Sequence, residues 1–239
     1  MKIRILTYNI HGLPWANQNI DLILLWIFYK CEADIVCFQE CFTHYSRRMI
    51  EEACQRRGWD CYFPEDPPML RRLIPSFQSG SGLCILSRKS FHLSSKLFIP
   101  FKEQKGVEIF ISKGFFICKF SYQGQHFQVV NTHLQSDFTE FKCFRINYPA
   151  VRAEQEKEMW EFLKFYSLPI LIGDCNQNLF YHFHCLDENF HITFPDTGEH
   201  LDHCIMLDKD MPKIKQRKIH YYDEVDFSDH IPVLYTIEL

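Results

Sequence analysis

Apolar runs recur along the chain between turn signals, and this alternation constrains the fold more than any other feature. The runs are rich in Ile, Val, Phe and Tyr, which favour β-strands. They cover residues 3–10, 34–40, 82–88, 115–122, 126–134, 169–174 and 231–239. Because apolar and polar side chains alternate on both sides of Gly124, residues 115–134 predict a hairpin that turns at this glycine.

Helical patterns lie between the predicted strands. Residues 19–33 are apolar nearly all round, as in a helix packed on a sheet, and residues 44–58 are amphipathic and end at Gly58. Residues 151–166 carry an apolar face made of Met159, Phe162, Leu163 and Tyr166. Strands and helices mix throughout without a linker-like or repetitive stretch, so we expect one α/β domain over residues 1–239.

The composition is that of a globular protein with a sizeable core. Of the 239 residues, 46% are hydrophobic and 23% are charged, and the net charge of -4 gives no overall field that favours nucleic acid. The apolar run at 22–29 is far shorter than the roughly 20 residues that span a bilayer, so no transmembrane segment is expected. The sequence has 11 Cys and no secretory signal, which predicts a cytoplasmic, reducing location and mostly free, buried thiols.

Histidine and cysteine gather in two short stretches, "YHFHC" at 181–185 and "EHLDHC" at 199–204. Zinc takes such ligands, but neither stretch has the spacing of a zinc finger. Loop or surface histidines are therefore the favoured interpretation, with a zinc site as the alternative.

Polar side chains suited to metal binding or proton transfer follow one predicted strand after another. They are Asn9, Glu40, Asn131, His133, Asp174, Asn176, Asp202, Asp229 and His230. Carboxylate and amide oxygens such as those of Glu40 and Asn9 suit Mg²⁺, and an imidazole held by a carboxylate, as in His230 with Asp202, suits a general base. Asn176 and a protonated His133 would supply hydrogen-bond donors to a phosphorane-like centre.

Together these motifs resemble the endonuclease/exonuclease/phosphatase superfamily, which includes DNase I-like nucleases, inositol polyphosphate phosphatases and neutral sphingomyelinases. The resemblance runs from Leu6 to about Val233, and it rests on "TYNIHG", "FQE", "GLCILSR", "NTHL", "GDCN", "LDH" and "SDH" in family order. It implies a four-layer α/β sandwich of two mainly antiparallel sheets packed face to face and flanked by helices, with the site at one rim.

Four further stretches are similar to the bacterial-type sphingomyelinase branch of that superfamily. They are "KGFFICKF" at 113–120, "THLQS" at 132–136, "VRAEQEKEMWEFL" at 151–163 and "VDFSDHIPV" at 225–233. The chain departs from that branch in lacking a secretion signal and in its shorter length.

The resemblance implies a Mg²⁺-dependent phosphodiesterase, with Mn²⁺ as a substitute metal. Glu40 resembles the principal metal ligand of the family, Asn9 supports the metal or the phosphate, and Asp229 resembles a further metal or hydrogen-bonding ligand. Asn131 and Arg152 are candidate substrate-binding residues. For Arg152, as for Gln155, a structural role is favoured over bracing the site, and His11 is left out of the catalytic set.

The catalytic roles implied by the resemblance fall on five residues. His230 resembles the base that removes a proton from the attacking water, and Asp202 orients it. Asp174 orients or deprotonates that water, and Asn176 holds the phosphate. His133 resembles the histidine that stabilises the phosphate or protonates the leaving oxygen.

The favoured substrate is a sphingomyelin-like lipid head group, and the alternative is the DNA of a DNase I-like nuclease. The irregular segments 64–81 and 135–149 are expected to lie beside the metal and to touch the membrane. Their apolar side chains would insert, and their basic side chains would meet lipid phosphates or, in a nuclease, the DNA backbone. These are Met69, Leu70, Leu73, Ile74, Phe77, Phe138, Phe141 and Phe144, with Arg71, Arg72, Lys142 and Arg145. The intact set from Asn9 to His230 argues against a third class, a catalytically inactive binding module.

Overall fold

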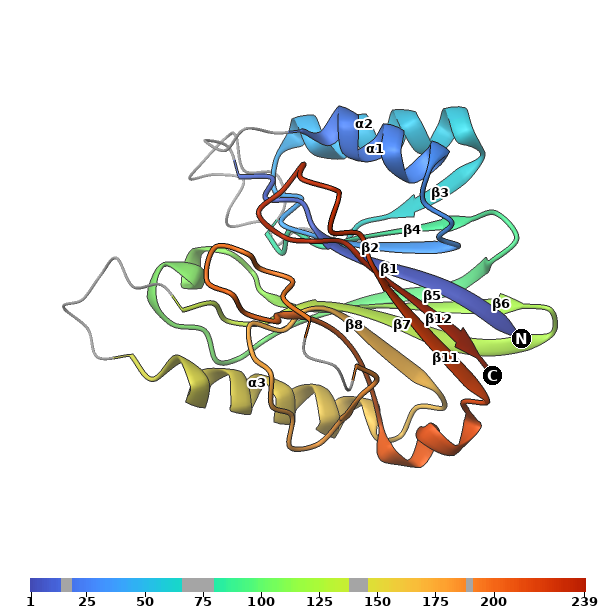
Figure 1. The fold of residues 1–239 in the computed structure, drawn as a ribbon. Helices are drawn as coiled ribbons and strands as arrows, with labels where there is room; N and C mark the ends of the chain where they lie inside the picture. Colours follow the sequence, from blue (N-terminus) through green and yellow to red (C-terminus); the bar gives the residue numbers. More distant parts are fainter. Residues whose placement is uncertain (14–18, 66–79, 138–145, 188–190) are drawn as a thin grey trace.

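Within the part of the chain that the structure describes, two six-stranded sheets and three α-helices form four layers (Figure 1). The computed structural model describes residues 1–13, 19–65, 80–137, 146–187 and 191–239. Helices α1 (Ile20–Tyr29) and α2 (His44–Arg57) cover the first sheet, and α3 (Tyr148–Leu163) covers the second. The predicted four-layer sandwich is therefore confirmed.

The first sheet has the strand order β11-β12-β1-β2-β4-β3. Strands β1 and β2 run parallel with Asn9 opposite Gln39, whereas the other neighbours are antiparallel. The carboxyl ends of β1 and β2 therefore meet at one edge, and Glu40 follows at once. The strand bounds are β1 (Lys2–Asn9), β2 (Ile35–Gln39), β3 (Trp59–Tyr62), β4 (Cys84–Arg88), β11 (Gln216–Tyr221) and β12 (Val233–Glu238).

The second sheet has the order β5-β6-β7-β8-β10-β9. Here β7 and β8 are parallel with His133 opposite Asp174, and β10 is antiparallel to β8 with Asp202 opposite Asp174. Three of the predicted site residues thus lie in a row across adjacent strands. The bounds are β5 (His92–Pro100), β6 (Gly114–Tyr122), β7 (Gln125–His133), β8 (Pro169–Asp174), β9 (His184–Cys185) and β10 (Asp202–Met206), with short 3₁₀ turns η2 (Gly106–Phe110) and η3 (Asp208–Lys213).

Three apolar clusters hold the layers together, one at each interface. The cluster between the sheets includes Ile3, Ile5, Phe116, Ile172 and Tyr235. A second cluster lies beneath α1 and α2, and a third, which includes Met159 and Leu163, lies beneath α3. Each large side chain buried in this way contributes about 1.5–3 kcal/mol to folding.

Local sequence signals determine where several elements begin and end. The Thr43 hydroxyl accepts a hydrogen bond from the Ser46 amide at 3.1 Å and caps α2, which ends at Gly58 in the left-handed conformation. Gln123 and Gly124 both have positive φ and form the tight turn between β6 and β7, as predicted. Strands β3, β5, β9, β10 and β11 lie outside the predicted strand segments.

Most of the two segments predicted to face the membrane lies outside the described residues. This holds for the apolar and basic side chains between 66 and 79 and between 138 and 145 that were expected to contact lipid or DNA phosphates. Among the residues that are described, no helix combines the length and the apolar character needed to cross a bilayer.

Candidate active site

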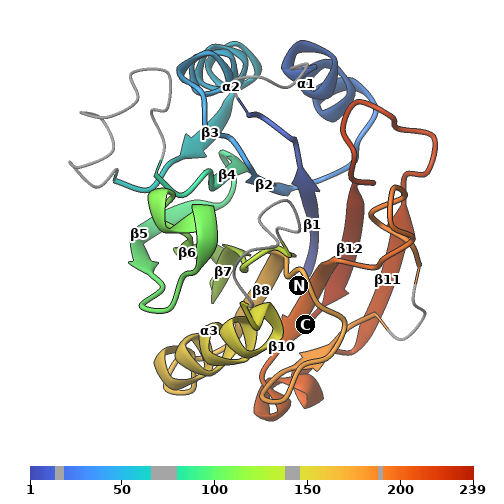
Figure 2. The ribbon, with the colours of Figure 1, turned by 90° about the vertical axis from the view of Figure 1, so that its left-hand side faces the viewer.

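The predicted site residues converge on one edge of the sandwich. This edge lies at the left of Figure 1, where β1 ends, and it faces the viewer in Figure 2. A cleft of about 520 Å³ opens there, and both sheets contribute to its walls. Its lining includes Glu40, His133, Asp174, Asn176, Asp229 and His230.

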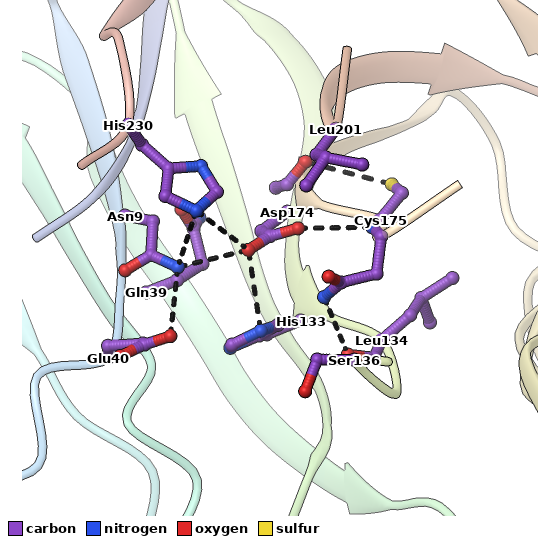
Figure 3. Close-up of polar contacts among 12 residues, drawn as sticks. Asn9, Gln39, Glu40, His133, Leu134, Ser136, Asp174, Cys175, Leu201 and His230 are labelled. Atoms are coloured by element: carbon purple, nitrogen blue, oxygen red, sulfur yellow. Dashed lines mark hydrogen bonds and ion pairs between the residues drawn. The ribbon is translucent and has the colours of Figure 1, made fainter. Parts of the chain in front are cut away.

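Asn9 lies behind the cleft and joins side chains from the two sheets (Figure 3). Its Nδ2 donates to Glu40 Oε1 at 3.1 Å and to Asp174 Oδ2 at 3.0 Å, and it lies 3.5 Å from His230 Nε2. The Asn9 side-chain oxygen accepts a hydrogen bond from the His11 amide at 3.1 Å. In this arrangement Asn9 supports the carboxylate of Glu40 and directs its own oxygen toward the backbone.

His230 and Asp202 form the buried pair that was predicted as an oriented base. His230 Nδ1 lies 2.8 Å from Asp202 Oδ2, and its Nε2 lies 3.6 Å from Asp174 Oδ2 on the cleft side. Burial disfavours the charged ring, but the carboxylates of Asp202 and Asp174 outweigh burial and raise the pKa of His230 to about 10. Because Nδ1 is bound to Asp202, Nε2 is the ring nitrogen that can exchange a proton with a molecule in the cleft.

Asp174 ends β8 directly after a strand position that only glycine can occupy. Gly173 has φ +152°, and a Cβ there would lie 2.0 Å from the Thr132 carbonyl oxygen. Asn176 takes the left-handed conformation, and its amide donates to Asp174 Oδ1 at 3.0 Å. Cys175 packs in the core beneath α3. Burial raises the pKa of Asp174 to about 7, against the opposing charge of His230.

His133 is neutral in this environment, contrary to the protonated form predicted from the sequence. Burial lowers its pKa well below the usual value, and the positive charges of Lys113 and His230 add to the effect. Its Nε2 lies 3.4 Å from Asp174 Oδ2. A neutral ring offers one N–H donor and one acceptor instead of two donors.

The residues around Glu40 fit a magnesium ion that retains several waters. Glu40 has φ +58° and lines the cleft together with Asp229. Burial disfavours the charged form of Asp229, but the hydrogen bond from His11 and the charge of His230 lower its pKa. No three His, Cys, Asp or Glu side chains of the described ranges form a metal-binding group. Because Mg²⁺ uses one or two carboxylates and waters, this donor set still suits it.

Asn131 was predicted to bind substrate; in the structure it links the two sheets, and the substrate-binding role stays a prediction. It is fully buried, and its Nδ2 donates to the carbonyl oxygens of Phe38 at 2.8 Å and Cys84 at 3.0 Å. Its Oδ1 accepts from Gln39 Nε2 at 2.8 Å. The side-chain amide of Asn131 is therefore hydrogen-bonded within the core and does not line the cleft.

Arg152 and Gln155 hold the chain that follows β7. Arg152 donates to the Gln135 carbonyl oxygen at 3.0 Å and to Asp137 Oδ1 at 2.6 Å. Gln155 accepts from the Gln135 amide at 2.9 Å and donates to the Glu103 carbonyl oxygen at 2.7 Å. These hydrogen bonds hold the segment beside the cleft, including the Asp137 carboxylate, which corresponds to bracing the site, the alternative to the structural role favoured for these residues.

The structure adds a buried ion pair that the sequence reasoning left without a role. Lys113 Nζ lies 2.6 Å from Glu108 Oε1 and donates to the Leu134 carbonyl oxygen at 2.6 Å. That carbonyl also accepts from Asn176 Nδ2 at 3.1 Å, and Glu108 accepts from the Ser136 hydroxyl at 2.6 Å. The only sequence signal for it was the "KGF" motif at residues 113–115.

The histidine and cysteine stretches near 182–204 form no metal group within the described residues. His200 and His203 are buried, with ring centroids 4.2 Å apart, and Cys185 Sγ lies 3.4 Å from His203 Nδ1. These two histidines are therefore buried in the core, whereas the favoured interpretation placed them in loops or on the surface.

Curated relatives of the chain include enzymes that act on phospholipids. Sphingomyelinase C 2 of Leptospira interrogans serogroup Icterohaemorrhagiae serovar Lai is 24% identical in an alignment of 201 residues that covers 74% of this chain and 31% of the relative. Phospholipase C of Staphylococcus aureus is 26% identical in an alignment of 199 residues that covers 74% of this chain and 57% of the relative. The chain thus spans roughly a third to somewhat over half the length of these relatives. A scan against models of protein families finds no match.

Solved structures with the same fold cover nearly the whole chain. SmcL has a TM-score of 0.78 at 16% identity and covers 99% of both chains. A beta toxin mutant from Staphylococcus aureus with bound magnesium ions has a TM-score of 0.70 at 21% identity, over 98% of this chain and 99% of that one. TDP2 of D. rerio, complexed with a single strand DNA product, has a TM-score of 0.70 at 16% identity, over 100% and 99%.

These comparisons confirm the resemblance that the motifs indicated. The fold is the DNase I-like sandwich, and the similar proteins include sphingomyelinases. At these identities the structural likeness establishes the fold, and the activity has to be argued from the site.

Proposed function

We propose that the chain is a metal-dependent phosphodiesterase that hydrolyses the head-group ester of a sphingomyelin-like phospholipid. One observation carries this proposal: the buried Asp202–His230 pair opens into a cleft that Glu40 also lines, and Asn9 Nδ2 contacts both Glu40 and His230. An oriented base facing a carboxylate suited to Mg²⁺ is the arrangement that water attack on a phosphodiester requires.

The metal would be held mainly through Glu40, with Asp229 beside it in the cleft. When bound, Mg²⁺ supplies positive charge that offsets the negative charge of the phosphate in the transition state. A similar protein, the beta toxin mutant described above, contains magnesium ions, which supports this choice of metal.

His230 takes a proton from the attacking water at Nε2. The hydrogen bond between Nδ1 and Asp202 fixes the ring and favours the imidazolium that forms. Asp174, 3.6 Å from Nε2, also lines the cleft and orients the same water. Both carboxylates are buried, so their charges act on the ring with little screening by solvent.

Asn176 and His133 stabilise the phosphate from the other wall of the cleft. One N–H of Asn176 Nδ2 is bound to the Leu134 carbonyl oxygen, which leaves the second N–H for a phosphate oxygen. His133, neutral and held next to Asp174, offers a single ring N–H. Fixed donors of this kind act where charge develops in the transition state.

The sphingomyelinase and phospholipase C relatives support a phospholipid substrate. A DNase I-like nuclease is the second candidate, and the likeness to TDP2 with its single strand DNA product favours it. Both candidates use the same base and the same metal site, so substrate has to be tested directly.

The test measures phosphocholine release from sphingomyelin vesicles and cleavage of single- and double-stranded DNA, each with Mg²⁺ and with EDTA. We expect Mg²⁺-dependent phosphocholine release that EDTA abolishes and that Mn²⁺ restores. DNA cleavage without phosphocholine release would overturn the lipid assignment in favour of the nuclease. Robust turnover of either substrate in EDTA would overturn the metal-dependent mechanism.

A further inference from the structure

Helix α1 is apolar on both sides, although only one of its sides faces the core. The inner side packs on the first sheet and consists of Ile20, Ile23, Leu24 and Ile27, all of them buried. On the outer side, Leu22, Leu25 and Tyr29 have relative exposures of 48%, 52% and 60%. The one charged residue of the helix is Asp21, in its first turn. A helix that is apolar all round is typical of a helix that is covered on both sides.

The three outer residues, Leu22, Leu25 and Tyr29, form what we call the α1 stripe. Their spacing of three and four residues places them on one line along the helix, as in the seam between two packed helices. The outer sides of the other two helices are mainly polar. Helix α2, which lies beside α1 (Figure 2), exposes charged residues such as Arg48 and Glu51, and α3 exposes Glu154, Lys157 and Glu161. Solvent exposure therefore accounts for the outer sides of α2 and α3 but not for the α1 stripe.

Opposite charges lie at the two ends of the α1 stripe. At its start, the Asp21 carboxylate accepts a hydrogen bond from the Tyr45 hydroxyl at 3.2 Å. At its end lie the exposed Lys30 and the guanidinium of Arg57, which is 4.3 Å from the centroid of the Tyr29 ring. The stripe is thus bounded by a carboxylate at one end and by cations at the other.

This pattern is complementary to a second copy of itself in one orientation. If two α1 helices pack antiparallel about a twofold axis between Leu25 and Trp26, Asp21 of each copy meets Lys30 of the other. Leu22 then meets Tyr29 of the second copy. Parallel helices would instead bring like charges together at both ends, which is unfavourable. A lipid surface attracts cations alone and leaves the carboxylate end without a partner, so the charges favour a second copy.

We propose that α1 is the contact surface of an antiparallel, twofold-symmetric homodimer in which the α1 stripes of two copies cover each other. The apolar side chains supply most of the binding free energy, and the ion pairs determine the orientation. One helix from each copy is a small contact compared with the roughly 1,600 Å² that standard interfaces bury, so we expect a dissociation constant in the micromolar range. The dimer is independent of the hydrolytic activity proposed above.

The direction of α1 determines where the two clefts lie in such a dimer. Helix α1 connects β1 to β2, and these strands are parallel and end at the cleft, so α1 begins at the cleft edge and runs away from it (Figure 1). Antiparallel pairing therefore places the two clefts at opposite ends of the dimer. Both clefts stay open, because none of the described residues that line the cleft belongs to α1.

Sedimentation velocity of the full chain, at about 1 to 500 µM, measures the monomer–dimer equilibrium. Leu25→Glu places two carboxylates beside the twofold axis and should raise the dissociation constant at least about tenfold. The matched control is Phe165→Glu, which replaces a side chain that is 83% exposed, beyond the end of α3 and on the opposite side of the molecule from α1 (Figure 1). This control should leave the dissociation constant unchanged.

A charge exchange tests the antiparallel orientation. Asp21→Lys should raise the dissociation constant several-fold, because two lysines then face each other at both ends of the contact. Adding Lys30→Asp to Asp21→Lys restores opposite charges in exchanged positions and should return the constant close to that of the unsubstituted protein. Glu161→Lys makes the same change of charge on α3 and serves as the control. Circular dichroism and thermal unfolding verify that each variant is folded.

A monomer at every concentration would overturn the dimer, and a dimer that Leu25→Glu leaves intact would overturn the role of α1. If Leu25→Glu does not fold, Leu25→Ser provides the same comparison with a smaller change. An unchanged dissociation constant in Asp21→Lys, or a loss that Lys30→Asp does not reverse, would overturn the antiparallel orientation. Binding of a monomer to vesicles of phosphatidylcholine and phosphatidylserine that Leu25→Glu abolishes would assign the stripe to a lipid surface and overturn the dimer.

Discussion

At the scale of single residues, the site is built from polar side chains that folding removes from water. Asn9, Asp174, Asp202 and His230 are all at most 5% exposed. Burying such groups is unfavourable unless hydrogen bonds and opposite charges compensate for the loss of water. The burial of the Asp202 carboxylate is compensated by His230, and the burial of Asp174 is compensated by hydrogen bonds from Asn9 and Asn176. Removing one of these side chains therefore leaves its partner buried without compensation.

Glu40→Gln tests the proposed metal ligand without changing the backbone conformation at φ +58°. We expect kcat to fall at least about 10²-fold, because a neutral amide binds Mg²⁺ more weakly and the phosphate charge is then less well offset. Activity measured against Mg²⁺ concentration should show a higher half-saturating concentration for the variant. An unchanged Mg²⁺ dependence would rule out Glu40 as the principal ligand.

His230→Ala tests the base. The expected loss in kcat is about 10²–10⁴-fold, the usual contribution of a positioned acid–base group. Circular dichroism checks that the variant is folded, and Glu161→Gln serves as the control. If the variant retains more than a tenth of the original kcat, a group other than His230 is the base.

The pH dependence of kcat follows from the raised pKa of His230. The ring has to be neutral to accept a proton, and the carboxylates of Asp202 and Asp174 keep it charged up to a pKa of about 10 in the metal-free protein. Activity should therefore rise with pH above neutrality, and Asp202→Asn should move that rise to lower pH. The free energy of unfolding changes with pH in the opposite direction to activity. The charged ring of His230 contributes its full stabilisation below about pH 6.5, and this contribution is lost as pH rises toward 10. A flat kcat profile across this range would contradict the role of His230 as base.

At the scale of secondary-structure elements, the internal strands other than β10 were predictable, and the edge strands β3, β5, β9 and β11 were not. Strands β1, β2, β7 and β8 are buried on both faces over most of their length, because one face meets the opposite sheet and the other meets a helix. Strands β5 and β11 lie at sheet edges with mostly exposed or half-buried residues, and β9 has two residues. Such strands form because a neighbour offers backbone hydrogen bonds, which leaves little trace in the sequence.

The site shows the same division between local and long-range causes. The polar residues at the ends of strands indicated Glu40 and Asp174, since a strand and its following turn are local, and the "SDH" motif before β12 indicated His230. The neutral state of His133 was not predictable, because it depends on burial and on Lys113, which β6 brings from twenty residues away in sequence. The placement of Asn131 in the core likewise depends on carbonyls of the opposite sheet.

Asn131→Ala tests whether that residue links the sheets or binds substrate. It removes hydrogen bonds to two carbonyl oxygens and to Gln39, all buried, and should lower the free energy of unfolding by about 2–4 kcal/mol. Denaturant unfolding measures the loss, and KM per folded molecule should stay unchanged. A raised KM with unchanged stability would instead support the substrate-binding role.

At the scale of the whole molecule, the site exists only where the two sheets meet. The first sheet and its flanking turns supply Asn9, Glu40, Asp229 and His230, and the second supplies His133, Asp174, Asn176 and Asp202. A shift of one sheet against the other would separate the base from its orienting carboxylate. Catalysis therefore depends on the core between the sheets as much as on the residues that touch the phosphate.

Denaturant titration tests this dependence. Because both halves of the site are held by one shared core, activity and tryptophan fluorescence should be lost with the same midpoint. Protein that has not been exposed to denaturant, assayed at saturating Mg²⁺, serves as the reference. Activity that disappears at clearly lower denaturant than fluorescence would show that the site opens before the sheets separate.

The pairing of β12 with β1 has a consequence for the order in which the protein becomes functional during its synthesis. The second sheet is formed from one continuous stretch, β5 to β10. This stretch is complete in the nascent chain while β1 is paired with β2 but still lacks its other neighbour, β12. Asp229 and His230 precede β12 directly, so they reach their positions only when this strand leaves the ribosome and pairs with β1. Nascent chains interrupted before residue 229 would carry most of the fold without its base, and hydrolysis would begin only once that strand is in place.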